Sequence, residues 1–365
     1  MRKVVINGRF GTRAMTGVDR VAQELTLALD RLMAEGALPD VAIEVVAPPG
    51  GLRPLGLSNI PIRQVGRMTG HAWEQIELPR ACRDAWLLNL CNTAPLVLRN
   101  ALVMMHDAQV YQTPDSYSQA FRAAYRFLMP VAARRCRTVT TVSDFSKGEL
   151  ERFGVVPPSK ARVVPNGGDH VDRIEGDRTV FARHGLAPDT YLLAIGSLSP
   201  HKNLATILEA QLRQTGPLRR LVIAGGSNPR IFSDKGLPAC SEAQFLGRVS
   251  DEELKALYEG AAALLFPSYF EGFGLPPLEA MRSGSPVIAS TAAAVREVCG
   301  GAALYADPAR VEEWVARIEE IGRDPSLRVQ LRSAGKARAA RFTWRLSALA
   351  LIEAIEESGY ALRSR

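Results

Sequence analysis

The stretch LLFPSYFEGFGLPPLEAMRSGSPVIAS, residues 264–290, is the part of the sequence that says most about the fold. An apolar run is followed by a loop with two glycines. Pro276 and Pro277 then favour the start of a helix, because proline suits the first helical turn. Gly284 is expected to end this helix, and the apolar run at 285–290 predicts another buried strand. Buried strands joined through a helix are typical of a parallel sheet with helices on both faces.

The loop and helix of this stretch suit the binding of an anion. Gly272 and Gly274 let backbone amides approach a ligand closely, and the following helix points its positive dipole end at the same place. Glu271 precedes the glycines, and Glu279 is expected in the first turn of the helix, where its carboxylate suits a pair of vicinal hydroxyls such as those of ribose. The alternative is that Glu271 caps a turn and Glu279 complements the helix dipole. The pattern as a whole favours a site for a diphosphate.

The same alternation continues along the whole chain. Residues 17–32 carry the periodicity of a helix with one apolar face, and residues 251–259 are another predicted helix. Both halves of the chain are therefore predicted to be α/β units with a doubly wound, Rossmann-like parallel sheet, which binds ligands at the carboxyl ends of its strands. The junction is expected near residues 165–177, where glycine and aspartate gather. The predicted strands are residues 3–6, 41–47, 101–105, 138–143, 161–165, 191–197, 218–226, 243–247, 262–268 and 285–290.

The composition is that of an ordinary soluble globular protein. Of the 365 residues, 47% are hydrophobic and 23% are charged, and the length favours two domains. The sequence contains no run of about 18 uncharged apolar residues that could span a membrane. The five cysteines are scattered without a CxxC spacing, which suits a reducing cytosol and neither a disulfide framework nor a zinc site.

Positive charge is concentrated in the first half of the chain. Residues 1–170 contain 21 Lys and Arg against 15 Asp and Glu, whereas the rest contains 24 against 23. This excess indicates either an anionic partner (a nucleic acid, a phospholipid surface or a phosphorylated substrate) or an incidental solvated face. Residues 121–138 interleave arginines with aromatic and apolar side chains, which suits a helix on an anionic membrane and equally a core-facing helix with a solvated edge. Nucleic acid is not expected as a partner, because no recognised nucleic-acid-binding module is present.

Several motifs resemble those of one enzyme family. The string EGFGLPPLE (271–279) is similar to the E-x7-E motif of retaining glycosyltransferases with the GT-B fold, in particular the mannosyltransferase-like branch of family 4. Any one such motif is weak, but several in the family's order make a strong resemblance. The other matching strings are TGVDRVAQEL (16–25), WEQIELP (73–79), HDAQVY (106–111), VSDFSKGEL (142–150), VVPNGGD (163–169), GSLSPHKN (196–203) and FLGRVSDEELKALY (245–258).

The resemblance implies a fold and a division of the chain. A GT-B enzyme has two Rossmann-like domains that face a cleft. Residues 1–170 are then the acceptor-binding domain, residues 171–345 bind the nucleotide-sugar donor, and the terminal helix of residues 346–365 packs back on the N-terminal domain.

The resemblance also implies roles for individual residues. Lys202 is expected to reach the donor diphosphate, Glu271 to position the donor sugar near its reacting face, and Glu279 to hold the ribose. His106 follows the predicted strand at 101–105 and is expected beside the hydroxyls of the donor sugar. Together, His106, Lys202 and Glu271 are the expected catalytic residues. The remaining donor-binding positions are Gly17, whose amide is expected near the donor phosphate, Val249 beside the base, and the backbone amides of Gly272, Phe273, Gly274 and Leu275.

This chain departs from the family at the phosphate site. Many relatives have arginine where Ser197 stands, and others have arginine at the position of His201. We expect Lys202, the amides of residues 272–275 and His201 to bind the phosphates instead. No cofactor or metal is expected, because no DxD-like pair stands in a suitable loop, so Lys202 and the helix N-terminus have to stabilise the leaving diphosphate.

The expected reaction is transfer of a hexosyl group with retention of the anomeric configuration. GDP-mannose is the favoured donor, with UDP- and dTDP-sugars compatible, and the expected acceptor is a saccharide or lipid-linked saccharide in glycan biosynthesis. The expected location is the cytoplasm, with peripheral contact to the inner face of the membrane through residues 121–138.

Three other functions are weighed against this one. An NAD-dependent oxidoreductase needs G-x-G-x-x-G after the first strand, and NGRFGTRAMTG (7–17) lacks that spacing. A glycosidase uses paired carboxylates, but here one of the two is predicted in a phosphate-binding helix start. A non-catalytic nucleotide-sugar-binding protein is disfavoured by the intact His106, Lys202, Glu271 and Glu279.

Overall fold

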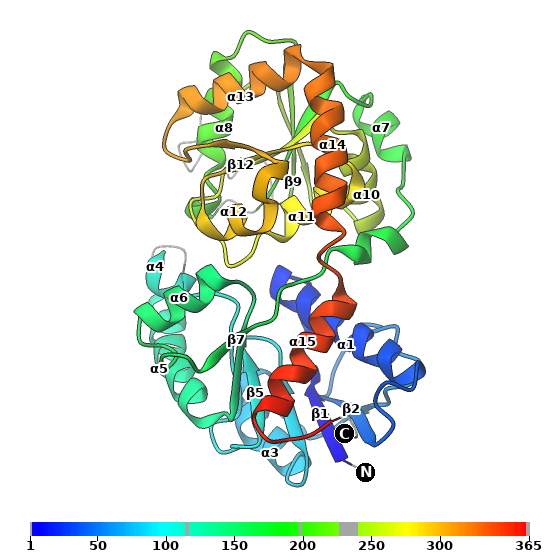
Figure 1. Cartoon of the computed structure of the whole chain (residues 1–365), viewed down its shortest axis with the longest axis vertical. Helices are drawn as coiled ribbons and strands as arrows, with labels where there is room; N and C mark the ends of the chain where they lie inside the picture. The colour runs from blue at the N-terminus through cyan, green and yellow to red at the C-terminus, as the bar shows by residue number, and fades with distance from the viewer. Residues whose placement is uncertain (1, 114–116, 197–198, 226–239, 363–365) are drawn as a thin grey trace. The chain divides into compact units, whose positions relative to one another are not determined.

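The chain forms two compact units, each with its own parallel sheet (Figure 1). The computed structural model describes residues 2–113, 117–196, 199–225 and 240–362. The first unit comprises Met1–Gly167 and Thr343–Arg365, and the second comprises Gly168–Phe342. The divisions thus fall a few residues before the predicted boundaries at 170 and 345.

The first unit is built on a seven-stranded sheet with the order β3-β2-β1-β4-β5-β6-β7. Every neighbouring pair is parallel. After β1, the chain adds β2 and β3 on one side of it and then β4 to β7 on the other side. The point of reversal lies between β1 and β4. The strands are β1 (Arg2–Asn7), β2 (Val41–Ala47), β3 (Ile62–Gln64), β4 (Trp86–Asn89), β5 (Ala101–Met104), β6 (Thr138–Thr141) and β7 (Ala161–Val163).

Helix α1 (Gly17–Ala34) shows how the sequence sets the local structure of this unit. Thr16 and Asp19 form a capping box that satisfies free amides at its start. Val21, Leu25 and Leu29 recur on one face and are buried, as the periodicity predicts. Helix α15 (Trp344–Glu357) packs against α1 within the same unit.

The other helices of the first unit are shorter, apart from one long helix that is half exposed. They are η1 (Gly8–Thr12), α2 (Gly70–Ala72), the π-helical turn η2 (Trp73–Glu77), α3 (Leu78–Ala81), α4 (Gln109–Gln112), α5 (Gln119–Arg135) and α6 (Asp144–Arg152). Among the helices of the described ranges, none in either unit is long and apolar enough to cross a bilayer.

The second unit contains a six-stranded parallel sheet with the order β10-β9-β8-β11-β12-β13. After β8, the chain adds β9 and β10 on one side and β11 to β13 on the other, so the strand order reverses between β8 and β11. The strands are β8 (Tyr191–Ile195), β9 (Arg220–Ala224), β10 (Ala243–Gly247), β11 (Ala263–Phe266), β12 (Val287–Ser290) and β13 (Leu304–Ala306).

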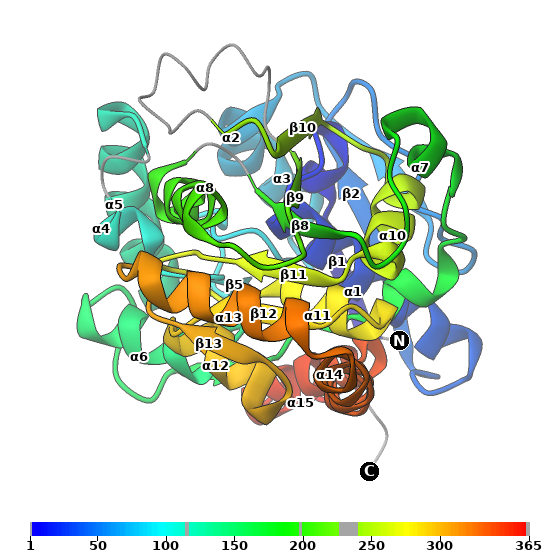
Figure 2. The same ribbon diagram turned by 90° about the horizontal axis from the view of Figure 1, so that it is seen from above.

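Helices cover both faces of this sheet. Helices α8 and α13 pack together on one face, and α7, α10, α11 and α14 form a connected group on the other (Figure 2). The helices are η4 (Asp169–Arg173), α7 (Thr179–His184), η5 (Pro200–Lys202), α8 (Leu204–Arg213), α10 (Asp251–Gly260), α11 (Leu275–Ser283), α12 (Ala293–Cys299), η6 (Gly300–Ala302), α13 (Val311–Arg323) and α14 (Pro325–Ala339).

The predicted fold class, two α/β units with parallel sheets, is confirmed. Each predicted strand corresponds to an observed one, although residues 197 and 226, at the ends of two of them, lie outside the described residues. Three strands were not predicted. One of these, β3, is exposed at all three residues and therefore has no apolar pattern to detect. The other two are β4 and β13, of four and three residues.

Candidate active site

Lys202 and Glu271 meet at the reversal point of the second sheet. Lys202 ends η5, which follows β8, and Glu271 lies in the loop after the neighbouring strand β11. The Nζ of Lys202 donates to Oε1 of Glu271 at 2.8 Å, with 21% and 15% of the two side chains exposed. Ligands of doubly wound folds bind at the carboxyl edge where the strand order reverses. The ion pair is therefore at the edge where a ligand is expected, and it is accessible to solvent.

The two loops that carry this pair are tied together. Asn203 adopts a left-handed conformation with φ 55°, and its Nδ2 donates to the carbonyls of Pro267 at 3.1 Å and Pro308 at 2.7 Å. The amide of Tyr269 donates to the carbonyl of His201 at 2.8 Å. These bonds hold the turn after β8 against the loop after β11, so the position of Lys202 relative to Glu271 is fixed by the backbone.

The loop after Glu271 opens helix α11. Gly274 is the N-cap with φ 110°, a conformation in which any other residue is strained. Leu275 is the first residue of the helix, and Pro276 and Pro277 after it carry no amide hydrogen. Of the expected donor amides, those of residues 272–274 therefore lie in the loop and that of Leu275 is the first of the helix, which otherwise contributes its dipole.

Glu279 lies in the second turn of α11, so the prediction that it lies in the first turn is wrong. The helix begins at Leu275, one residue before the two prolines at which it was predicted to start. Glu279 is buried, and its Oε1 lies 3.0 Å from Nε2 of His170. Its Oε2 accepts from the hydroxyl of Tyr258 at 2.8 Å. Burial, and then the neighbouring Glu279 carboxylate, raise the pKa of Tyr258 well above its ordinary value, so the hydroxyl remains a donor.

Sequence reasoning missed both partners of Glu279. His170 belongs to η4 and Tyr258 to α10, so three separate segments converge on one carboxylate. The family-like strings VVPNGGD and FLGRVSDEELKALY end next to His170 and at Tyr258 respectively. They were the only indication in the sequence that these segments belong to the site.

The remaining donor-binding residues expected from the sequence are Ser197, His201, Val249 and Gly17. Ser197 lies outside the described residues. Burial, and then the charge of Lys202, lower the pKa of His201 to about 4. His201 is therefore neutral at pH 7 and offers a hydrogen bond to a phosphate, but no second positive charge. Val249 lies between β10 and α10, and Gly17 is the exposed first residue of α1, where a Cβ would have no contact within 4 Å.

His106 follows β5 and is buried in the first unit. Its Nε2 lies 2.8 Å from the carbonyl oxygen of Leu90, so this nitrogen carries the hydrogen. Burial lowers the pKa of His106 to about 4, which keeps the ring neutral at pH 7. The remaining nitrogen, Nδ1, is then a hydrogen-bond acceptor, suited to a hydroxyl and unable to donate a proton.

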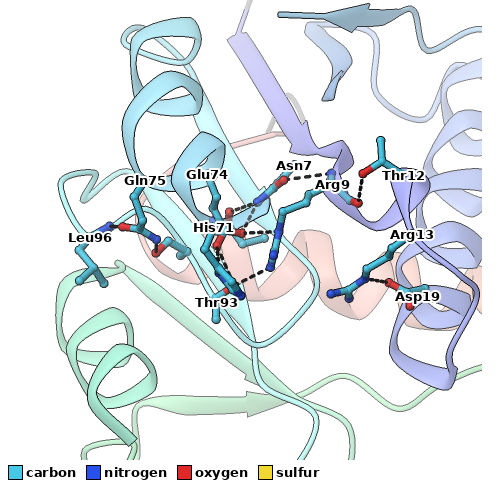
Figure 3. A network of polar contacts seen from close by, with 12 residues as sticks. Asn7, Arg9, Thr12, Arg13, Asp19, His71, Glu74, Gln75, Thr93 and Leu96 are labelled. Carbon is cyan, nitrogen blue, oxygen red and sulfur yellow. Dashed lines mark hydrogen bonds and ion pairs between the residues drawn. The ribbon is translucent and has the colours of Figure 1, made fainter. Parts of the chain in front are cut away.

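A network of buried polar side chains marks the reversal point of the first sheet (Figure 3). At its centre is Glu74, on η2. Its Oε1 accepts from Asn7 Nδ2 at 2.9 Å and lies 3.3 Å from Nε of Arg9. Its Oε2 accepts from Thr93 Oγ1 at 2.9 Å and lies 3.1 Å from Nδ1 of His71. Burial opposes ionisation, but the bond from His71 and the charge of Arg9 outweigh it, so the pKa of Glu74 is lowered.

The network is anchored to the ends of the two strands at the reversal. Asn7 ends β1 and donates through Nδ2 to Oδ1 of Asn89, the last residue of β4, at 3.0 Å. Arg9 donates through Nη2 to Oγ1 of Thr93 at 3.0 Å. The described residues contain no group of three or more His, Cys, Asp or Glu arranged to hold a metal ion.

Comparison with known proteins identifies the family. Residues 91–171 match the family model described as Glycosyltransferase Family 4, and residues 178–338 match the model described as Glycosyl transferases group 1. The O-antigen chain mannosyltransferase B of Escherichia coli is 32% identical over 265 residues, which are 68% of this chain and 68% of that protein. The chain belongs to glycosyltransferase family 4.

Two further curated relatives show how far the alignments of this family 4 chain extend. The O-antigen chain mannosyltransferase RfbU of Salmonella typhimurium is 32% identical over 237 residues, which are 64% of each chain. The serotype-specific mannosyltransferase WbdA of Escherichia coli is 32% identical over 179 residues, which are 46% of this chain and 22% of WbdA. The chain thus spans just under two thirds of RfbU and about a fifth of WbdA.

Solved structures agree with the fold over nearly the whole family 4 chain. The Anabaena protein Alr3699/HepE, in complex with UDP and glucose, has a TM-score of 0.73 at 17% identity and covers 98% of this chain and 100% of its own. Sucrose-phosphate synthase from Thermosynechococcus elongatus has a TM-score of 0.72 at 18% identity, with 98% and 99% covered. At these identities the agreement concerns the fold, which is GT-B.

Proposed function

We propose that the chain is a retaining, metal-independent glycosyltransferase. In this proposal it moves a hexosyl group, with mannose favoured, from a nucleotide-sugar to a saccharide or lipid-linked saccharide in glycan biosynthesis. The second unit binds the donor and the first binds the acceptor. The observation that carries the proposal is the Lys202–Glu271 pair at the reversal point of the second sheet, beside the glycine loop that opens α11.

The donor diphosphate is expected to take the place of Glu271 at the Nζ of Lys202. Because the pair is partly exposed, exchange of one anion for another costs little. Glu271 is then released to accept a hydrogen bond from a hydroxyl of the donor sugar. The amides of residues 272–275 bind the phosphate oxygens as negative charge builds up on the leaving group. The carboxylate of Glu279, held in place by His170 and Tyr258, receives the ribose hydroxyls.

The chemical step needs no protein nucleophile. The bond between the anomeric carbon and the phosphate oxygen breaks, and the acceptor oxygen bonds to the same face of that carbon. The proton of the acceptor hydroxyl passes to the leaving phosphate, which departs with the nucleoside. His106, neutral and with Nδ1 as an acceptor, orients a sugar hydroxyl and moves no proton.

The choice of sugar and acceptor rests on the relatives. RfbU, mannosyltransferase B and WbdA are each named as mannosyltransferases, which favours GDP-mannose. The complexes of Alr3699/HepE contain UDP and glucose, so a UDP-sugar is the donor to test against it.

The test is nucleoside diphosphate release from GDP-mannose, UDP-glucose and a dTDP-hexose, with and without octyl glycosides or an acceptor lipid extract. We expect GDP-mannose to be consumed fastest, consumption to rise with acceptor, and EDTA to leave the rate unchanged. Proton NMR of the product should show the anomeric configuration of the donor. Tight binding of a nucleotide-sugar without turnover would show a binding protein, and loss of activity in EDTA would contradict metal independence.

We also propose that α5 contacts an anionic membrane surface from the cytoplasmic side. Its buried face consists of Tyr125, Met129 and small residues, whereas Phe127 is 62% exposed and Arg126 is exposed beside it. An exposed aromatic ring among arginines is typical of helices at the membrane interface. The other exposed arginines near the end of this helix are Arg134, Arg135 and Arg137.

Vesicle sedimentation tests this contact. The chain should bind vesicles with about 30% phosphatidylglycerol and not vesicles of phosphatidylcholine alone, and the double variant Phe127→Ser with Arg126→Gln should bind at least threefold more weakly. Equal binding by the parent chain and this variant would remove α5 from the proposal without affecting the transfer reaction.

A further inference from the structure

His71 stands at the edge of the buried network at the reversal point of the first sheet. It lies on α2, with 41% of its side chain exposed. On one side its Nδ1 is 3.1 Å from Oε2 of Glu74. Its ring also meets the ring of Tyr125 edge-on, with centroids 6.0 Å apart and planes at 88°. Figure 3 shows His71 beside Glu74, and the contact with this carboxylate ties the orientation of the ring to the buried network.

The network also fixes which ring nitrogen of His71 donates to Glu74. The Glu74 carboxyl has a lowered pKa and is ionised, so its oxygens only accept hydrogen bonds. Nδ1 of His71 must therefore carry the hydrogen that it shares with Glu74. Nε2, the other ring nitrogen, has no hydrogen-bond partner among the residues that the structure describes. The result is an outward-facing ring nitrogen of fixed orientation that can form a hydrogen bond.

The position of this nitrogen matches the place where a doubly wound sheet binds its ligand. Asn7 and Asn89, which end β1 and β4, connect the network to the reversal point of the sheet. In the second unit, the equivalent edge carries the Lys202–Glu271 pair. We propose that His71 is an acceptor-binding residue: its Nε2 forms a hydrogen bond with a hydroxyl of the saccharide acceptor, while Glu74 holds the ring. This inference rests on the proposed function, because it assigns the acceptor to the first unit.

Two amide substitutions separate binding from a structural role. The amide nitrogen of an asparagine at this position falls near Nδ1 of the histidine, so His71→Asn keeps the bond to Glu74 and removes the outward-facing nitrogen. The amide group of a glutamine falls near Nε2, so His71→Gln keeps a polar group facing the acceptor and loses the bond to Glu74. The two variants therefore remove opposite ends of the imidazole.

The experiment measures transfer from GDP-mannose to octyl α-mannoside, octyl β-galactoside and octyl β-N-acetylglucosaminide by the full chain. For the best of these acceptors, His71→Asn should raise KM by about three- to tenfold, which is the worth of one hydrogen bond. His71→Gln should stay closer to the parent. The KM for GDP-mannose and the rate of donor hydrolysis without acceptor should stay within about twofold in both. His184→Asn, a half-buried histidine on α7 of the second unit, is the matched control and should change nothing.

The outcomes separate this inference from the proposed function. If the parent transfers mannose and His71→Asn keeps the parent KM for the acceptor while His71→Gln is impaired, His71 is structural and only this inference fails. If both variants change the KM for GDP-mannose more than that for the acceptor, the assignment of His71 to the acceptor is wrong. If GDP-mannose is hydrolysed but no octyl glycoside is mannosylated by the parent, the acceptor class is wrong and the role of His71 falls with it.

Discussion

The reversal points of the two sheets both carry a cation–carboxylate pair, and the two pairs are built differently. In the first unit, the side chains of Arg9 and Glu74 are 8% and 1% exposed, and Glu74 has donors from four side chains around its two oxygens. In the second unit, Lys202 and Glu271 are 21% and 15% exposed and are joined at 2.8 Å. A buried charge that loses its partner destabilises a protein strongly, whereas a partly exposed pair is nearly neutral to stability.

The difference in burial implies different roles for the two ion pairs. The Arg9–Glu74 network is structural, and in our proposal it holds the ring of His71. In the proposed reaction the Lys202–Glu271 pair separates, and each member turns to the substrate when a donor binds. Stability effects should therefore be concentrated in the first pair and activity effects in the second.

Glu74→Gln is the substitution with the largest expected effect on the first pair. It leaves Arg9 buried without a countercharge and turns an amide NH₂ toward side chains that donate, so the free energy of unfolding should fall by about 3–5 kcal/mol. Urea denaturation measures this. The matched control is Glu35→Gln, which breaks the exposed ion pair with Arg345 in the same unit and should cost less than about 1 kcal/mol. Similar losses for the two variants would contradict the contrast in burial.

Lys202→Ala tests the second pair. The kcat/KM for nucleotide-sugar should fall by about 10²–10³-fold, because a charge directed at the leaving phosphate is lost. The melting temperature should stay within about 2 °C of the parent, since the pair is partly exposed. Lys336→Ala removes an exposed lysine of the same unit and should leave both quantities unchanged. A large fall in stability with full activity would contradict this prediction and show that Lys202, like Arg9, has a structural role.

The buried His106 predicts an acid limit of stability. His106 has its pKa lowered to about 4 by burial, against about 6.5 in the unfolded chain. As the pH falls from about 6.5 to 4, the unfolded state takes up a proton that the folded state does not, so stability falls by about 3 kcal/mol. His106→Gln keeps a donor toward Leu90 and cannot titrate, so its unfolding free energy should change less over this range. An equal pH dependence in the two proteins would contradict a neutral, buried His106.

Tyr258→Phe has the smallest expected effect. It tests whether Glu279 belongs to the donor site. It removes one bond to the carboxylate, so the KM for the donor should rise by about three- to tenfold with little change in kcat. Tyr191→Phe is the matched control, because the hydroxyl of Tyr191 is also buried and donates to the carbonyl of Leu257 at 2.7 Å. Its effect should be on stability alone. Equal donor KM values for the two variants would show that Tyr258 only packs.

The fold could be predicted from the sequence because it depends on local patterns. The strand, glycine loop and helix of residues 264–290 follow from the nature and order of neighbouring residues, and the alternation in the rest of the chain follows the same rule. A short exposed strand such as β3 leaves no such pattern. The start of α11 was misjudged because prolines are tolerated throughout the first turn and do not fix which residue begins it.

The candidate site could be predicted only in part. Lys202 and Glu271 are 69 residues apart but follow adjacent strands, so their meeting could be expected from the fold. His170 is 109 residues from Glu279, and Asn7 is 67 residues from Glu74. Such contacts depend on how separate loops pack over a sheet, which no local pattern encodes. His71 has no ligand spacing in the sequence, and its proposed role depends on its contact with Glu74.

A crystal structure of the chain with GDP-mannose, or with UDP-glucose if that is the better donor, tests the central claim most directly. The account predicts the diphosphate within hydrogen-bond distance of Nζ of Lys202 and of the amides of residues 272–275. Glu271 should then be turned away from Lys202, and Glu74 should be unchanged in its network. A diphosphate bound elsewhere, or one bound while Lys202 keeps its contact with Glu271, would contradict it.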